Sequence, residues 1–245
     1  MSKLIDGSAF IINLAGSDIM TQWNAKTKKL IYDSRVLTTR KIVRAITLLN
    51  SPPGVLFNAS AVGIYDEKHY HTEESHYFSH DFLSNVVRDW EVSAFDAEEQ
   101  DVKVFCLRFG TVLSTRGGAL KQLIPFFKRS LGAYIGSGKQ YFPFIHIHDV
   151  AEAIHFLYSK GRAGGVYNFT APEIITNAYF SKMLGKKKKK PVFLKIPNFA
   201  LRLKYGDASN ILSQGQQVYP KRLLEQGYKF WFPDIETTLD NLLNS

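Results

Sequence analysis

Small and polar side chains collect where three short apolar runs of the sequence end, and these are the residues best suited to chemistry. If the runs are parallel strands, their carboxyl ends meet at one edge of a sheet, where open α/β sheets bind their ligands. A serine and a tyrosine at such an edge could move a proton, and arginines could bind phosphate or carboxylate groups. Turn formation is the plainer explanation of one such cluster, but three at successive strand ends favour a site. The clusters are Asn13, Leu14, Ala15 and Gly16; Ser60, Ala61, Val62, Gly63, Ile64 and Tyr65; and Arg108, Phe109, Gly110 and Thr111.

The apolar runs that would position these clusters alternate with segments of helical periodicity. Continuous apolar runs at residues 8–16, 55–60 and 103–108 are typical of strands that are buried on both faces of a parallel sheet. Apolar side chains recur at helical spacing over residues 31–49, and a second helical pattern covers residues 79–99. Strands that alternate with long helices predict an α/β fold with a doubly wound parallel sheet.

The pattern loosens after residue 111, and a second part of the molecule is expected there. We expect residues 1–164 to form the sheet domain, with an insertion on the substrate side at about residues 112–142. Residues 165–245 are expected to form a small α+β C-terminal lobe that caps the site. The site would then lie between the two parts.

Residues 143–154 are predicted to form a short strand that runs into a helix. Asp149 can start this helix, because a carboxylate accepts hydrogen bonds from free backbone N–H groups. His146 faces the opposite side of the strand from Ile145 and Ile147, and an imidazole there could take part in acid/base chemistry. A structural histidine whose hydrogen bonds are satisfied is the favoured alternative.

Composition indicates an ordinary globular protein with a sizeable core. The chain has 245 residues, of which 45% are hydrophobic and 22% charged. No apolar run approaches the roughly 18 residues needed to span a bilayer, and no secretory signal is visible. The single cysteine, Cys106, lies within an apolar run, so we expect it to pack in the core of a cytoplasmic protein. No Cys/His cluster has the spacing of a metal site, so no metal is predicted.

One run of charge stands out in a chain of net charge +9. Five of the 31 basic residues are consecutive, at residues 186–190. Such a run could bind nucleic acid or anionic lipid. No aromatic side chains are interleaved for base stacking, so a solvated loop between a helix and a strand is the favoured interpretation. Neither nucleic acid nor a membrane is expected as a partner.

Taken together, these segments resemble the epimerase family of atypical extended short-chain dehydrogenases/reductases, a group with a distinctive C-terminal domain. The resemblance covers almost the whole chain and rests on many segments in the family's order. The segments are NLAG at 13–16, SRVLTTR at 34–40, SAVGIY at 60–65, DWE at 89–91, LR at 107–108, the glycine loop and strand at 135–150, and YNFTAPE at 167–173. The family-specific marks are GQQVYPKRL at 215–223 and GYKF at 227–230.

The resemblance implies a Rossmann-type fold, NADP or NAD as cofactor, and epimerase, dehydratase or reductase chemistry on a sugar-like or small polar substrate. Ser60 would stand at the position of the family's catalytic serine, and Tyr65 is the best remaining residue for proton transfer, with packing beneath the cap as an equal alternative. Arg35 and Arg108 would bind phosphate or carboxylate, with structural ion pairs to helix carboxylates as an equal alternative. The expected cofactor-binding residues are Asn13, Leu14, Ala15, Gly16, Arg35, Ser60, Arg108 and Gly110, and the expected substrate-binding residues are Ile64, Tyr65, Gln140 and His146.

Two departures from the family pattern bear on activity. The opening strand, glycine-rich turn and helix that hold the cofactor pyrophosphate have no counterpart before the strand at residues 9–14, which puts cofactor binding in question. Leu83 and Val87 stand where the family has a tyrosine and a lysine, and neither can move a proton. A non-catalytic homologue that binds a partner or ligand without redox chemistry is therefore the alternative function.

An N-terminally truncated sheet of this kind would leave the strand at residues 9–14 at an edge. The unpaired N–H and C=O groups of an apolar edge strand invite pairing with another chain. The partner would be a second copy of the chain or a complementing N-terminal segment.

Overall fold

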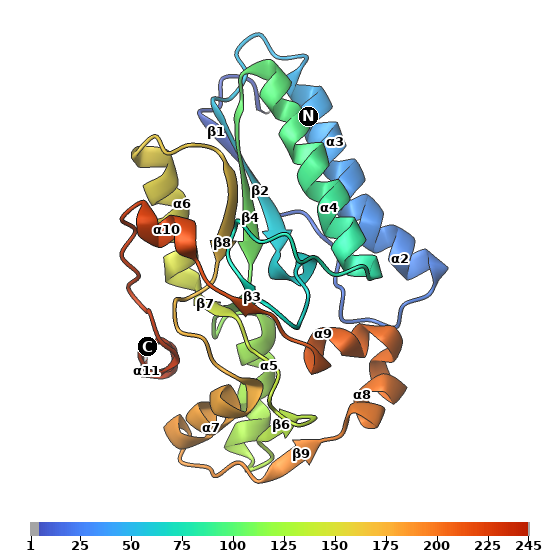
Figure 1. The fold of residues 1–245 in the computed structure, drawn as a ribbon, viewed down its shortest axis with the longest axis vertical. Coiled ribbons are helices and arrows are strands. Elements are labelled where there is room, and N and C mark those ends of the chain that lie inside the picture. The colour runs from blue at the N-terminus through green and yellow to red at the C-terminus, as the bar shows by residue number, and fades with distance from the viewer. Residues whose placement is uncertain (1–4, 245) are drawn as a thin grey trace.

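Figure 1 shows the computed structural model, which describes residues 5–244 of the chain. Its main sheet has the strand order β1–β2–β4–β8, and all neighbouring strands are parallel. These strands are β1 (Phe10–Asn13), β2 (Val55–Ala61), β4 (Lys103–Phe109) and β8 (Gly165–Phe169). The expected α/β fold with a parallel sheet is confirmed, and so is the edge position of the first strand.

Side chains of the central strands alternate between two apolar layers, one on each face of the sheet. Leu56 of β2 and Cys106 of β4 pack against α3 (Thr38–Ile46) and α4 (Phe82–Phe95). Phe57 and Phe105 stack 4.8 Å apart on the other face, next to α6 (Ile147–Ser159). Figure 1 shows α3 and α4 along one face of the sheet and α6 along the other. Because both faces of the central strands are covered, β2 and β4 are continuous buried runs, and burial raises the pKa of the Cys106 thiol. The expectation of burial on both faces is wrong for β1, because this edge strand leaves Phe10 and Ile12 each 40% exposed.

The helices that cover the sheet begin at capping side chains. Asn24 and Thr27 form a reciprocal capping box at the start of α2 (Ala25–Tyr32). Asp81 accepts a backbone N–H at 2.8 Å at the start of α4. The chain passes from α2 to α3 through a π-helical segment, η1 (Asp33–Leu37), which contains Arg35. π-Helical turns within longer helices occur frequently at functional sites.

The C-terminal lobe is built from two segments that are far apart in the sequence. Between β4 and β8 the chain forms β5 (Thr111–Leu113), α5 (Gly118–Lys128), β6 (Ala133–Ile135) and β7 (Phe144–His146), with β7 paired to β5. After β8 it forms α7 (Asn177–Lys187) and β9 (Leu194–Ile196), with β9 paired to β6. The shared core includes Phe127, Phe144 and Phe180. The later elements are α8 (Asn198–Tyr205), α9 (Asn210–Ser213), β10 (Gln217–Val218), α10 (Lys221–Glu225) and α11 (Ile235–Asn244), and β10 pairs with β3 (Tyr70–His71).

The division expected between residues 164 and 165 falls directly before β8, which is a strand of the main sheet. One of the two segments of the lobe precedes this strand, and the other follows it, from α7 onward. None of the helices within residues 5–244 has the length and hydrophobicity to span a bilayer.

The helix after β7 begins two residues earlier than the sequence predicted. α6 starts at Ile147, and His146 is its cap, because His146 Nδ1 accepts a backbone N–H of the first turn at 2.9 Å. Asp149 is buried and accepts hydrogen bonds from the Tyr228 hydroxyl at 2.8 Å and from the backbone N–H groups of residues 231 and 232 at 2.9 and 3.0 Å. The prediction that Asp149 starts the helix is therefore wrong. Its carboxylate fixes the segment that leads into α11.

Candidate active site

Ser60 and Tyr65, the two predicted proton-transfer residues, are joined by a buried hydrogen-bond network. The Ser60 hydroxyl at the end of β2 donates to a carboxylate oxygen of Glu91 on α4. Arg108 on β4 donates to both oxygens of Glu91, each at 2.7 Å. A third nitrogen of Arg108 donates to the Tyr65 hydroxyl, also at 2.7 Å. The network follows from the sheet register, which sets Ser60 and Arg108 side by side.

The Tyr65 hydroxyl has two further partners. It lies 2.9 Å from Asn168 Oδ1 and 3.1 Å from the carbonyl oxygen of Thr72. Burial raises the pKa of Tyr65, and the nearby Arg108 guanidinium opposes this shift. The exposed fraction is 0% for Tyr65 and 3% for Ser60. Both hydroxyls are committed to the network in this conformation, so their catalytic roles stay predictions.

Arg108 forms the structural ion pair that the sequence left open as one of two roles. The side chains of Arg108 and Glu91 are 6% and 8% exposed. Burial disfavours the charge, but the hydrogen bonds and the charge of Glu91 outweigh it and raise the pKa of Arg108. Nε, Nη1 and Nη2 all donate within the network. Binding of a cofactor phosphate by Arg108 stays a prediction.

A second polar cluster lies at the end of β1. Asn13 Nδ2 donates to Asn58 Oδ1 on β2 at 2.6 Å and to Thr39 Oγ1 on α3 at 2.8 Å. Trp90 Nε1 donates to the same Thr39 oxygen at 2.9 Å, and its ring is buried. Asn13 Oδ1 also accepts the backbone N–H of Ala15 at 3.2 Å. This cluster therefore fixes the loop that follows β1.

Arg35 lies directly against the loop that follows β1. Its Nη2 donates to the carbonyl of Ser17 at 3.1 Å, and its Nη1 donates to the carbonyl of Ile31 at 3.3 Å. A Cβ atom on Gly16 would lie 3.0 Å from the guanidinium carbon, so glycine lets the loop approach this closely. Burial lowers the pKa of Arg35, and the charge of Asp18 opposes this shift. The structure thus brings the predicted residues Gly16 and Arg35 together at one strand end.

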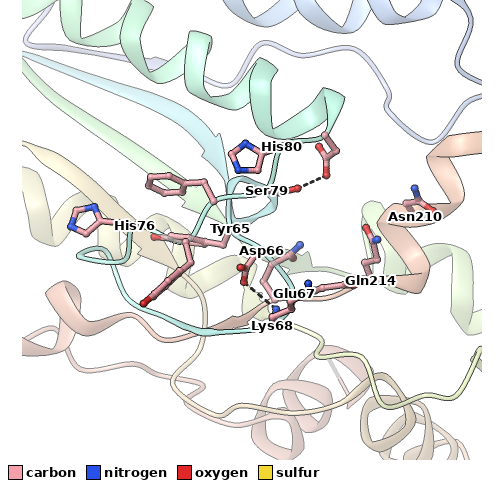
Figure 2. A pocket seen from close by; sticks show the side chains of 13 residues that line it. Tyr65, Asp66, Glu67, Lys68, His76, Ser79, His80, Asn210 and Gln214 are labelled. Atoms are coloured by element: carbon pink, nitrogen blue, oxygen red, sulfur yellow. Dashed lines mark hydrogen bonds between the residues drawn. The ribbon is translucent and has the colours of Figure 1, made fainter.

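An open pocket of about 510 Å³ lies beside Tyr65 (Figure 2). One wall is the loop of residues 65–81, and the other consists of residues 210–216. Figure 2 shows Asp66 and Lys68 on the loop side and Asn210 and Gln214 on the opposite side. The lining is largely polar, because charged groups and histidines of the loop face side-chain amides from the C-terminal lobe. Such a surface can bind a ligand rich in hydroxyl groups.

Asp66 is held firmly in the pocket wall. Its Oδ1 accepts the backbone N–H groups of Lys68 and His69 at 3.0 and 3.1 Å, and its Oδ2 lies 2.7 Å from the His69 ring. Partial burial acts to raise the pKa of Asp66, but these hydrogen bonds outweigh it and lower the pKa. His71 lies behind Asp66 and stacks 4.6 Å from Tyr65, and burial lowers its pKa. The pocket wall therefore has a fixed carboxylate, with a buried histidine behind it.

The predicted substrate residues do not all reach this pocket. Tyr65 borders it although its side chain is buried, while Ile64, at the end of η2 (Val62–Ile64), is buried and does not line it. Gln140 Nε2 donates to the carbonyl of Leu212 at 3.3 Å, so Gln140 supports α9 from behind. His146 does not line the pocket, and its Nε2 lies 3.1 Å from Asn241 Oδ1. Burial lowers the pKa of His146, and both its substrate role and the structural alternative stay predictions.

Gly110 has a packing reason to be glycine. A Cβ atom at this position would lie 2.8 Å from the carbonyl oxygen of Pro143. The close approach brings the chain after β4 against the segment before β7, where the backbone N–H of Thr111 donates to that same carbonyl at 2.8 Å.

No group of three His, Cys, Asp or Glu side chains in the described part of the chain is arranged to hold a metal ion.

Several residues of the site were not predicted from the sequence. Glu91 is the centre of the buried network, and Asn168 contacts the Tyr65 hydroxyl, but the sequence indicates both only as members of segments that resemble the family. The sequence does contain a signal for Glu91, because it indicates that Arg108 could form an ion pair with a carboxylate on a helix. Asn210 and Gln214 had no local signal, since only the fold brings them opposite residues 65–81.

Comparison with known proteins gives the relationship of the chain. Residues 1–169 match the NAD dependent epimerase/dehydratase family, and residues 196–242 match a domain of unknown function, DUF1731. The chain is 36% identical over 245 residues to the epimerase family protein SDR39U1 homolog, chloroplastic, of Arabidopsis thaliana, covering 96% of this chain and 68% of that protein. It is 34% identical over 235 residues to the epimerase family protein YfhF of Bacillus subtilis, covering 95% of this chain and 77% of that protein.

Its structure resembles the crystal structure of human epimerase family protein SDR39U1 (isoform 2) with NADPH. The TM-score is 0.91 at 30% identity, and the match covers 100% of this chain and 86% of the human chain. The sequence similarity covers 96% of this chain and the structural similarity covers all of it. The chain belongs to the NAD-dependent epimerase/dehydratase family.

Proposed function

We propose that this chain binds a nicotinamide dinucleotide, NADPH in preference to NADH, along the carboxyl ends of β1 and β2. The observation that carries the proposal is the similarity over the whole chain, at a TM-score of 0.91, to a human protein whose structure contains NADPH. When bound, such a cofactor supplies hydride transfer to or from a substrate carbon. The position agrees with the rule that open parallel sheets bind ligands beyond their carboxyl ends.

The residues at this edge fit such a cofactor. The guanidinium of Arg35 provides a positive charge beside Gly16, where backbone and cation together suit a phosphate group. Leu14 is 63% exposed, and its side chain can cover one face of a flat ring. The cofactor roles of Ser60 and Gly110 stay predictions.

The substrate that we propose is sugar-like or small and polar, and it occupies the pocket beside Tyr65. A volume of about 510 Å³ lies within the usual range for small-molecule sites. The fixed carboxylate of Asp66 can accept hydrogen bonds from hydroxyl groups. The amides of Asn210 and Gln214 can both donate and accept. The proposed reaction class is epimerase, dehydratase or reductase chemistry.

A non-catalytic ligand-binding homologue is the second candidate, and one observation favours it. The hydroxyls of Ser60 and Tyr65 are buried and used within the network. Leu83 and Val87 on α4 cannot replace a tyrosine and a lysine in proton transfer. Cofactor binding without turnover would distinguish this candidate from the enzyme.

We also propose that the exposed edge of β1 pairs with a second copy of the chain or with a complementing segment. The outer edge of β8 is capped by side chains, because Glu73 accepts the N–H of Asn168 at 2.9 Å and Arg222 donates to the carbonyl of Val166 at 3.0 Å. Within residues 5–244, β1 has a neighbouring strand on one side, β2. An apolar edge of this kind favours association.

The compartment that we propose is the cytoplasm. The thiol of Cys106 is reduced and buried, which suits a reducing environment. The Arabidopsis relative has the word chloroplastic in its name, so a chloroplast protein occurs among the relatives.

Calorimetric titration of the purified chain with NADPH and then NADH tests the proposal. We expect saturable one-to-one binding, tighter for NADPH. Arg35→Ala should weaken NADPH binding at least about tenfold, because it removes about one charge-assisted hydrogen bond between the guanidinium and a cofactor phosphate. Arg44→Ala, which removes an exposed arginine on α3, is the matched control and should leave the affinity unchanged. A folded chain that binds neither dinucleotide would overturn the proposal.

A further inference from the structure

The positive charge of the chain is concentrated in one part of the C-terminal lobe. Residues 112–142 and 174–206 contain 14 Lys and Arg and no Asp or Glu. The rest of the chain contains the other 17 Lys and Arg together with all 22 Asp and Glu. The net charge of +9 therefore arises from these two regions, while the remainder of the chain has more acidic than basic residues. Such a separation of charge orients a protein toward an anionic surface.

The fold brings two segments of these regions to one end of the molecule. We call residues 126–131 and 186–195 the basic tip. The first segment closes α5, and the second joins α7 to β9. Strand β6 follows the first segment, and β9 begins at the end of the second. The two strands pair, with Ala133 opposite Leu194. Figure 1 shows the turn after α5 and the loop before β9 at the same end of the lobe, away from the main sheet.

The basic tip is charged on its surface. Lys128, Arg129, Lys189 and Lys195 are exposed. Burial lowers the pKa of Lys188, and the charge of the adjacent Lys128 adds to this effect, so the two segments are close enough to repel each other. Near the start of the lysine run, Lys187 forms ion pairs with two carboxylates of α11, Glu236 at 3.1 Å and Asp240 at 2.7 Å. The outer residues of the tip remain available to a partner.

Large apolar side chains project among these charges. Phe193 is 81% exposed and Leu131 is 52% exposed. Phe126 and Leu194 are exposed as well, and the N–H of Leu131 donates to the carbonyl of Phe126 at 2.9 Å. The sequence favoured a solvated loop because the lysine run contains no aromatic residue. The structure supplies the missing apolar groups from the chain that enters β9 and from the last turn of α5 with the residues that follow it.

We propose that the basic tip docks on the surface of an anionic lipid bilayer. Lysines and arginines at a membrane surface are attracted by acidic headgroups, and exposed Phe and Leu side chains enter the boundary with the acyl chains. Two of the four exposed apolar groups are leucines, which have no face for base stacking, so the surface suits lipid better than nucleic acid. Docking would leave the main sheet away from the bilayer, because the tip and the main sheet lie at opposite ends of the molecule (Figure 1).

Co-sedimentation with vesicles of phosphatidylcholine, and of phosphatidylcholine with phosphatidylserine, tests this inference. We expect the full chain to bind the phosphatidylserine vesicles at low salt and to be released at high salt. Lys128→Glu with Lys189→Glu should weaken binding at least about tenfold, since each basic residue near the surface contributes to attraction. Lys41→Glu with Arg44→Glu makes the same change of charge on α3 and should weaken it much less.

A site-specific label separates docking by the tip from general electrostatic adsorption. The single native cysteine is buried, so a Phe193→Cys variant offers one accessible thiol for a polarity-sensitive fluorophore. Its emission should shift to the blue when phosphatidylserine vesicles are added. The same label at Val92→Cys, an exposed position on α4, should not respond.

Three results would overturn the inference. One is a folded chain that fails to bind phosphatidylserine vesicles at low salt. Another is binding that the paired substitutions in the tip and on α3 weaken equally. The third is binding of single-stranded DNA by a chain that ignores both kinds of vesicle, which would assign the tip to nucleic acid.

Discussion

Arg108 binds both carboxylate oxygens of Glu91 at 2.7 Å, and this buried pair links β4 of the sheet to α4. The pair also supports the residues at the strand ends, because the Ser60 hydroxyl donates to Glu91 and Arg108 donates to the Tyr65 hydroxyl. Removal of either charge would leave the other buried without its partner. The pair is therefore a structural centre of the candidate site.

We expect Glu91→Gln to lower the free energy of unfolding by about 3 kcal/mol, because Arg108 would keep its charge in a buried position without an ionised partner. Urea denaturation monitored by circular dichroism measures this change. Lys29→Ala removes one partner of an exposed ion pair with Asp33 and is the control. The prediction fails if the two substitutions shift the denaturation midpoint equally.

Tyr65→Phe separates the structural role of the hydroxyl from the predicted catalytic one. The ring would still stack on His71, but Arg108 and Asn168 would each lose a partner. We expect a loss of about 1–3 kcal/mol in stability and an unchanged NADPH affinity. Tyr77→Phe, in the same pocket wall, is the control. If stability is retained and turnover of an identified substrate falls at least about a hundredfold, Tyr65 transfers a proton.

The central strands of the sheet could be predicted from the sequence because they are covered on both faces. The short apolar runs around Leu56 and Phe105 show no alternation between apolar and polar residues. This pattern is typical of buried strands in a parallel sheet, so it predicts both their positions and their parallel arrangement. The edge position of β1 followed from the order of the segments. Local pattern and tertiary structure agree in this part of the molecule.

The lobe and the pocket were less predictable for physical reasons. A carboxylate such as Asp149 can cap a helix, but it can equally accept hydrogen bonds from a distant segment, and only the fold brings the Tyr228 hydroxyl to it. The pocket lies between a loop and α9, and Asn210 and Gln214 carry no periodic signal for their position. Residue types limited the chemistry, whereas tertiary packing determined which groups meet.

Stability should fall as the pH is lowered from about 7.5 to about 5.5. Burial lowers the pKa values of His71 and His146 below their ordinary value of 6.5, so the folded state holds both rings neutral. The unfolded chain binds protons more readily, so the stability that these residues contribute is present above about pH 6.5 and is lost as the pH falls through the lowered pKa values. Urea denaturation at several pH values measures the trend.

The contribution of one of these histidines can be isolated. His146→Asn should make the dependence of stability on pH shallower between about pH 7 and pH 5, since it removes one group that must otherwise be protonated in the unfolded state. His155→Asn changes an exposed histidine on α6 and should leave the dependence as in the wild type. Equal slopes for all three proteins would show that other groups cause the trend.

Ile12→Lys should reduce association of the chain through the edge of β1. Phe10 and Ile12 are each 40% exposed on this strand, whereas the opposite edge of the sheet is capped by Glu73 and Arg222. A lysine on an edge strand opposes pairing because its charge would have to be desolvated between two chains. Light scattering coupled to size-exclusion chromatography should show a dimer for the wild type at micromolar concentration and a shift toward monomer for the variant. Val92→Lys places the same charge at an exposed position on α4 and should leave the dimer intact. A wild-type chain that is monomeric at these concentrations would contradict pairing with a second copy.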